Sequence, residues 1–238
     1  MTMTPLAEWL QEQYPAKQVI DANGEPLSLW VTCPARLAFP ALVEPRKMEG
    51  SLQEPKYQAT LLFPLGADMA ILNRAAFGMA SDQFGESRVK AMWASPTFRK
   101  PFRPQSEKDY DGFERNADAK FISVSSKFKP KMFDEKRLEI QADDPRIYPG
   151  VWVRAQLRCF AYDQAGNRGV SFGLSSLQRL ADDEPFSTGG GDAADGLDEA
   201  VAVPAHLRQG GPASAPVNGV DTTPPSDYRR AVDDEIPF

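Results

Sequence analysis

The stretch VWVRAQLRCFAY, residues 151–162, alternates between two kinds of side chain, as a β-strand does. One face of such a strand is wholly apolar and can pack into a hydrophobic core. The other face has rings and guanidinium groups and no acid: Trp152, Arg154, Gln156, Arg158, Phe160 and Tyr162. Single-stranded nucleic acid needs cations for its phosphates and flat rings for its bases. The stretch therefore predicts a half-buried strand with a nucleic-acid-binding outer face. A strand covered by a loop or helix is the alternative.

Other segments predict further strands and one substantial helix around this stretch. The segment YQATLLF at 57–63 is rich in strand-forming residues and ends at Pro64. A helix is predicted over 68–84, capped by Asp68, with Met69, Leu72, Ala76 and Met79 on its buried face. Alternation predicts strands at 27–33, 37–43, 120–129 and 168–174, and a hairpin loop at 163–167.

The faces of the weaker strands are predicted from the same alternation. Leu27, Leu29, Val31 and Cys33 are expected to point inward, as are Leu37, Phe39, Ala41 and Val43. Pro40 places the second of these strands at a sheet edge or a bulge. The small outward residues Gly169, Ser171 and Gly173 leave room for something to lie across the last hairpin.

Basic and aromatic residues interleave a second time in the middle of the chain. Residues 88–120 look irregular, and long loops inside compact domains are usually functional or disordered. A solvated loop pinned by a few rings is the alternative. Predicted phosphate contacts are Arg99, Lys100, Arg103, Lys127, Lys129, Arg154 and Arg158, and predicted base-stacking residues are Trp93, Phe102, Phe121, Trp152, Phe160 and Tyr162.

The charge distribution separates a body from a tail. The net charge is −6, yet residues 1–186 hold 24 cations and 24 acids. Residues 88–137 carry 13 cations and seven acids, whereas residues 187–238 carry three cations and nine acids. This asymmetry favours a body that binds a polyanion.

Composition narrows the classes of chemistry. His206 is the only histidine, and Cys33 and Cys159 read as buried thiols. These counts exclude His-based catalytic triads and multi-histidine metal sites, and no cofactor or metal is predicted. No apolar run is long enough to span a membrane and no signal peptide is evident, so a cytosolic location is expected. A nuclease would need clustered carboxylates, and the spacing of Asp109, Asp111, Asp143 and Asp144 does not require one.

The last 52 residues predict a disordered tail with a binding tip. Residues 187–238 contain seven glycines and six prolines and too little apolar surface to fold alone. The tail ends in acids followed by apolar residues, a pattern typical of a peptide ligand that docks at a basic rim. The tip consists of Asp233, Asp234, Glu235, Ile236, Pro237 and Phe238.

This tip resembles the C-terminal tip of bacterial single-stranded DNA-binding proteins. The body instead resembles the single-stranded DNA-binding proteins of tailed phages, in KYQATLLFP (56–64), in the basic middle and in the segment 150–180. The resemblance implies an OB-fold that binds single-stranded DNA and a tip that recruits replication proteins such as a polymerase or primase. Phage types are monomers or dimers, so a homodimer is one state that the resemblance leaves open.

Together these observations predict a mainly β protein. We expect residues 1–186 to form an elaborated five-stranded OB-fold barrel with one substantial helix, and residues 187–238 to form a disordered acidic tail. The expected function is sequence-nonspecific binding and protection of single-stranded DNA in phage replication, recombination and repair, without enzymatic activity or a membrane partner. A metal-dependent nuclease, and an RNA-binding or strand-annealing protein, are the alternatives.

Overall fold

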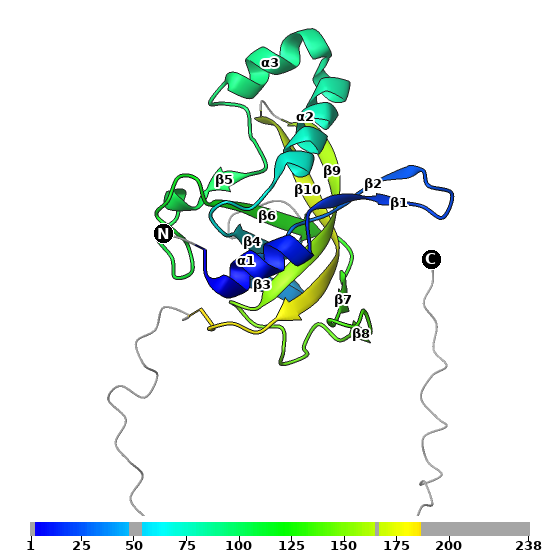
Figure 1. Cartoon of the computed structure of the whole chain (residues 1–238). Helices are drawn as coiled ribbons and strands as arrows, with labels where there is room; N and C mark the ends of the chain where they lie inside the picture. Colours follow the sequence, from blue (N-terminus) through cyan, green and yellow to red (C-terminus); the bar gives the residue numbers. More distant parts are fainter. Residues whose placement is uncertain (1–2, 48–53, 165–166, 187–238) are drawn as a thin grey trace, which may run out of the picture. The chain divides into compact units, whose positions relative to one another are not determined.

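The computed structural model describes residues 3–47, 54–164 and 167–186, and the predicted tail with its tip lies outside these residues. The described part is mainly β, with three α-helices (Figure 1). Its elements are α1 (Pro5–Gln13), β1 (Lys17–Ile20), β2 (Pro26–Val31), β3 (Ala35–Arg46), β4 (Lys56–Phe63), α2 (Ala70–Phe84), α3 (Glu86–Ala94), β5 (Arg103–Pro104), the 3₁₀ turn η1 (Gln105–Glu107), β6 (Lys120–Ser126), β7 (Lys131–Phe133), β8 (Glu139–Ile140), β9 (Trp152–Gln164) and β10 (Asn167–Ala181).

Five of the strands close into a ring. The order is β3-β4-β6-β10-β9, and β9 pairs again with β3. Every pairing is antiparallel except that of β6 with β10, which is parallel. If these five strands are numbered 1 to 5 in their order along the chain, their order around the ring is 1-2-3-5-4-1, which is the connectivity of an OB barrel. The predicted fold class is therefore confirmed.

The apolar face of β9 lies inside this barrel, as the alternation predicts. Val151, Val153, Ala155 and Leu157 are fully buried, and Cys159 is 4% exposed. Burial raises the pKa of both thiols, Cys33 and Cys159, to about 12. The two cysteines are free and buried, as predicted.

Helix α2 covers one end of the barrel core. Leu72, Ala76 and Ala80 belong to the same buried cluster as β9, and the Sγ of Cys159 lies 3.9 Å from the carbonyl oxygen of Ala75. The carboxylate of Asp68 accepts a hydrogen bond from the N–H of Ala70 at the start of the helix. The predicted helix is confirmed, although Met79 is only half-buried.

Helix α3 was not predicted, since residues 88–120 read as irregular. Only Val89 of this nine-residue helix is buried, so its sequence lacks the apolar stripe that periodicity detects. In Figure 1, α2 and α3 stand together above the strands.

Two strand faces also differ from the prediction. On β3, the register shifts between Ala38 and Ala41, so Leu42 is buried while Phe39 and Val43 are exposed. This confirms a bulge at Pro40 and reverses the face that follows it. On β2, Leu27 is exposed and Trp30 is buried instead, because only the end of this strand pairs with β9.

The barrel strands β9 and β10 also pair with strands outside the ring. β9 pairs with β2, and β10 pairs with β7, so that β1 and β2 on one side and β7 and β8 on the other extend the same sheet. Helix α1 packs on the lower part of β9 and β10 through Ala7 and Leu10, and the hydroxyl of Thr4 caps its first turn.

Arg36 secures the last described residues against the barrel. Its guanidinium forms an ion pair with Asp183 at 2.9 Å and donates hydrogen bonds to the carbonyl oxygens of Gly150 and Glu184. It also lies over the ring of Phe186. Desolvation by these neighbours lowers the pKa of Arg36. These contacts of Arg36 hold residues 182–186, the last described residues, against the barrel.

Candidate nucleic-acid interface

A shallow trough with a floor of small polar side chains crosses the outer face of the barrel. Gln58 and Thr60 of β4 lie opposite Ser125 and Ser123 of β6. With Phe39 these residues line a hollow of about 230 Å³. Gly173 of β10 pairs with Ser125 and continues the floor toward β9. In OB-folds the face of strands 2 and 3, which are β4 and β6 here, is where oligonucleotides bind.

Three aromatic rings form one wall of the trough. Phe39 lies 5.4 Å from Tyr110 and 6.1 Å from Phe113, measured between ring centroids. Phe39 is 50% exposed and Tyr110 59%. Phe39 also has a φ of 46°, a left-handed conformation in which a bulky residue is strained. The bulge of β3 therefore holds an apolar ring out in solvent, at a cost in stability, beside the polar floor.

The β9–β10 hairpin forms the opposite wall. Phe160 is 44% exposed and lies 6.5 Å from Tyr162. Its ring lies beside Gly173, where an added Cβ would be 3.8 Å from it. Along the path β3-β4-β6-β10-β9, this wall lies on the other side of the floor strands β4 and β6 from Phe39. The trough thus has exposed rings on both sides of a floor without bulky side chains.

A segment of the same chain, around Arg99, occupies the space that the small residues of β10 were predicted to leave. The N–H of Arg99 donates to the carbonyl of Arg168, and the N–H of Val170 donates to the carbonyl of Arg99. A Cβ on Gly169 would lie 2.4 Å from the carbonyl oxygen of Arg99. The glycine is therefore required for this crossing, which places Arg99 and Lys100 beside the hairpin.

The structure brings several of the predicted cations to the trough. Arg158 pairs across the strands with Gly173 in the floor, and Lys127 comes directly after the end of β6 at Ser126. Lys127 forms only a solvent-exposed ion pair with Glu54, at 3.4 Å. The exposed predicted cations are Arg158 on β9, Arg99 and Lys100 beside the hairpin, and Lys127 and Lys129 in the segment that follows β6.

This geometry agrees with the comparisons with known proteins. The family model of the single-stranded DNA-binding protein of Enterobacter phage Enc34 matches residues 30–205. The chain belongs to this family of phage single-stranded DNA-binding proteins. Protein p50 of Acyrthosiphon pisum secondary endosymbiont phage 1 is 30% identical over an alignment of 161 residues, and the match covers 65% of this chain and 84% of that protein.

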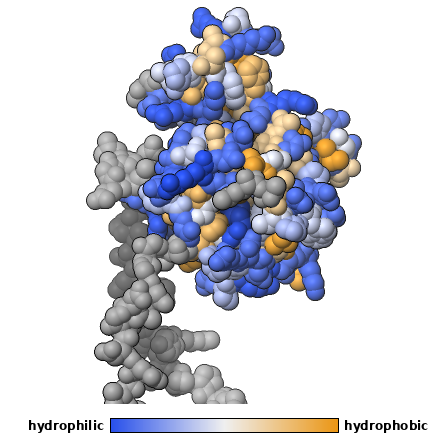
Figure 2. Space-filling view, turned by 60° about the vertical axis from the view of Figure 1, so that its left-hand side comes forward, coloured by the Kyte–Doolittle hydropathy of each residue, from blue (hydrophilic) through white to orange (hydrophobic). Residues whose placement is uncertain are grey.

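Solved structures of the Enc34 protein share the fold. The protein alone has a TM-score of 0.55 at 21% identity, over 77% of this chain and 99% of that chain. Its complex with single-stranded DNA has a TM-score of 0.56 at 21% identity, over 74% of this chain and 99% of that chain. The face of the present protein seen in Figure 2 is mainly hydrophilic, with hydrophobic residues in small separate groups.

Two predicted stacking residues are buried, and their prediction is wrong. Trp152 is 3% exposed under Ala7 and Leu10 of α1, and its Nε1 donates to Asp183 at 2.7 Å. Phe121 is 2% exposed and packs with Phe113 at 5.3 Å. Both rings do lie on the outer face of their strands. A helix in one case and the 105–118 segment in the other cover that face, so neither ring has a surface open to a base.

Trp93 and Phe102 also pack in the protein interior. Trp93 lies 5.4 Å from Phe77 and 5.6 Å from Phe98, and Phe102 lies 5.7 Å from Phe172. Both are only partly exposed. The aromatic residues of the predicted loop 88–120 thus mainly pin it to the barrel, as the alternative interpretation of that loop expects.

Two predicted phosphate contacts lie elsewhere or are already engaged. Arg103 forms an ion pair with Glu107 at 3.0 Å and lies over the ring of Phe121 at 4.7 Å. Arg154 is half-buried in a separate groove, where its Nε donates to Gln178. Neither side chain belongs to the trough.

Three exposed rings, Phe39, Tyr110 and Phe128, are candidate contacts that the sequence patterns did not indicate. Phe128 is 83% exposed directly after Lys127. Pro40 could have indicated that Phe39 points outward, because a proline inside a strand is typical of a bulge. Alternation alone assigned this ring to the inner face. Among the described residues, no group of three metal-ligating side chains lies close enough to hold an ion, and no helix is long and apolar enough to span a membrane.

Proposed function

We propose that this chain binds single-stranded DNA across the trough without strong sequence preference. The observation that carries the proposal is the polar floor of β4 and β6 between two walls of exposed rings. Rings accept any base because every base has a π-face, and cations track the phosphate backbone. Phe39 and Phe160 would stack bases, while Arg158 and Lys127 would contact phosphates. Small hydroxyl and amide groups between them let the strand approach closely.

In the cell such binding would protect exposed strands during phage DNA replication, recombination and repair. A strand held across the trough cannot pair with itself and is shielded from nucleases. The chain would act in the cytoplasm of the infected bacterial host and would need no catalytic group. A magnesium-dependent cleavage assay and a competition with RNA of the same sequence test the nuclease and RNA-binding alternatives directly.

A salt titration tests the trough as a polyanion site. If about four cations each displace a condensed counterion, log K should fall with log salt at a slope near −3, at roughly 0.7 per phosphate. The measurement is fluorescence anisotropy of a labelled oligo-thymidine of about six nucleotides, within the usual range for one OB-fold. A labelled oligonucleotide is preferable to tryptophan emission, because Trp30 and Trp152 are buried. A slope near zero would contradict the trough model.

The tail and its tip support a second part of the proposal. An acidic segment ending in Asp233–Phe238 has the composition of a peptide ligand, and we propose that it recruits a replication protein such as the polymerase or primase. The nine tail acids would also compete with DNA for the basic body at low salt.

Deletion of Phe238 should separate these two roles. The variant keeps every acidic side chain, so its affinity for DNA should match that of the intact chain. It should lose capture of purified phage or host polymerase or primase, since small peptide interfaces concentrate their energy in aromatic anchors. A pull-down with both forms makes the comparison, and substitution of Pro225 by alanine provides a control within the tail. Equal capture by all forms would rule out recruitment through the tip.

A further inference from the structure

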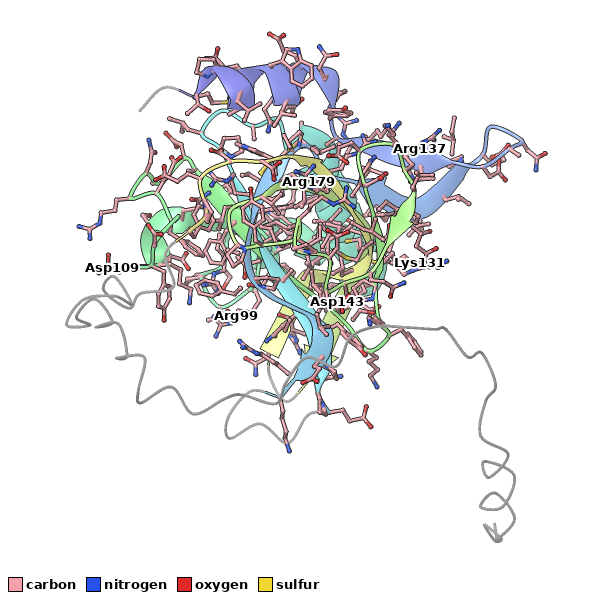
Figure 3. The ribbon with its side chains drawn as sticks, turned by 90° about the horizontal axis from the view of Figure 1, so that it is seen from below. Arg99, Asp109, Lys131, Arg137, Asp143 and Arg179 are labelled. Atoms are coloured by element: carbon pink, nitrogen blue, oxygen red, sulfur yellow. The ribbon has the colours of Figure 1, made fainter. Side chains whose placement is uncertain are left out.

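A second basic groove lies on the outer face of β9 and β10, between β1 and β7. It has a volume of about 470 Å³ and is bounded by β1 on one side and by β7 and its following turn on the other. Its lining includes three cations from three separate elements, Lys17 of β1, Arg154 of β9 and Arg137 of the turn after β7, and no acidic residue. In Figure 3, Arg137 lies toward the β1–β2 hairpin, on the other side of the molecule from Arg99.

Arg154 is held in place at the floor of this groove. Its guanidinium lies 4.8 Å from the centre of the Tyr14 ring, and its Nε donates to the Oε1 of Gln178 at 2.9 Å. Among the described residues no acid forms an ion pair with it. Desolvation lowers the pKa of Arg154, and the charge of Arg137 acts in the same direction. A half-buried arginine beside a second cation leaves positive charge unbalanced inside the groove.

The turn that carries Arg137 is fixed to the same glutamine. The Nε2 of Gln178 donates to the carbonyl oxygens of Asp134 and Glu135, and the carboxylate of Asp134 accepts from the N–H of Leu138 at 2.8 Å. Gln178 thus connects the arginine of the floor with the turn at the rim. Arg154 and the backbone of the turn that carries Arg137 are therefore held in place before any ligand arrives.

Arg137 stands where the backbone favours glycine. Its φ is 65°, in the left-handed region that strains a residue with a side chain. Glycine would relieve this strain and would remove the charge. The presence of arginine at such a position is an observation that favours a function for its side chain.

The groove is continuous with the trough along one strand. Arg154, Gln156 and Arg158 alternate on the same face of β9, and Gln156 lines the groove. Arg158 lies four positions after Arg154, or about 13 Å further along the strand. An extended polynucleotide that leaves the trough at Arg158 would therefore reach the groove without leaving the protein surface.

We propose that this groove is a second subsite, which binds backbone phosphates of a single strand already held in the trough. The proposal rests on the proposed function, since the trough supplies the first contact. The absence of acids from the lining and the planar donors of Arg154 fit phosphodiester oxygens. The continuity with the trough favours a polynucleotide over the acidic tail as the ligand.

Oligonucleotide length tests the subsite. For the full chain, a labelled oligo-thymidine of about 16 nucleotides should show a steeper salt slope than one of about six nucleotides, by about 2 for three additional phosphates. The double variant Lys17→Gln/Arg137→Gly should bind the longer oligomer at least about 10-fold more weakly, given the strength of charged hydrogen bonds, and its slope should be about 1.4 shallower. Its affinity for the short oligomer should not change.

Lys136→Gln is the matched control, because Lys136 is exposed on the same turn but does not line the groove. Its affinities should equal those of the unchanged chain. The thermal midpoint of Arg137→Gly should be equal or higher, which separates a lost contact from a lost fold. An unchanged affinity of the double variant for the longer oligomer would overturn the subsite.

A synthetic peptide of residues 227–238 tests the competing ligand. Loss of peptide binding in the double variant, with DNA binding unchanged at both lengths, would assign the groove to the tail and overturn the proposal. If the unchanged chain binds neither oligomer, the proposed function fails. If the short oligomer binds but the longer oligomer shows the same affinity and salt slope, the subsite is ruled out while the proposed function stands.

Discussion

Reversing two cations beside the trough should reduce affinity for single-stranded DNA by more than about 100-fold at low salt. The variant is Arg158→Glu/Lys127→Glu, and each change removes a charged contact and adds a repulsive charge next to the phosphates. Both side chains are exposed and lie outside the buried core. Anisotropy titrations of the six-nucleotide oligomer measure the loss, and circular dichroism checks that the fold is retained.

A variant with the same change in net charge provides the control. Arg74→Glu/Lys90→Glu alters two exposed residues on α2 and α3, away from the trough floor. If long-range charge alone governs binding, both double variants should weaken it equally. If the trough is the site, the helix variant should lose far less affinity. Equal losses would show that this face has no special role.

Removal of one exposed ring should have the second largest effect. Phe160→Ala should weaken binding by about 1–3 kcal/mol if a base stacks on this ring, and Phe39→Ala should do the same at the other wall. Phe160→Tyr keeps the π-face and should retain affinity, whereas Phe160→Leu keeps apolar volume and should not. The same anisotropy titration measures all four variants. Retained affinity in the leucine variant would mean that Phe160 does not stack.

Trp152→Ala separates a binding ring from a structural ring. This residue is almost fully buried under α1, so its truncation should cost about 3–5 kcal/mol of unfolding free energy. The remaining folded protein should bind DNA normally. Urea denaturation followed by circular dichroism gives the first quantity, and titration at low temperature gives the second. A loss of affinity in a fully folded variant would restore Trp152 to the interface.

Local patterns in the sequence determined the framework of this protein. The alternation of residues 151–162 specified the inner face of β9, because a period of two leaves one consistent set of apolar residues for the core. The spacing of Leu72 and Ala76 specified the buried face of α2 in the same way. The excess of cations over acids between Arg88 and Arg137 indicated a polyanion partner without any knowledge of the fold.

Only the tertiary structure decided how the outer face of β9 is used. Trp152 lies under α1, Arg154 lies in the groove beside β1, and Arg158 and Phe160 remain exposed at the trough. Alternation assigns a side chain to a face, but segments distant in sequence decide what covers that face.

Two aromatic residues, Phe39 and Phe121, show the same limit. A single extra residue at the β3 bulge turned Phe39 outward, since a shift of one position reverses every face that follows. Phe121 was assigned to the correct face of its strand, yet Phe113 and the segment around it cover that face. The inner face follows from hydrophobicity along the strand, whereas exposure of the outer face depends on contacts that no local pattern contains.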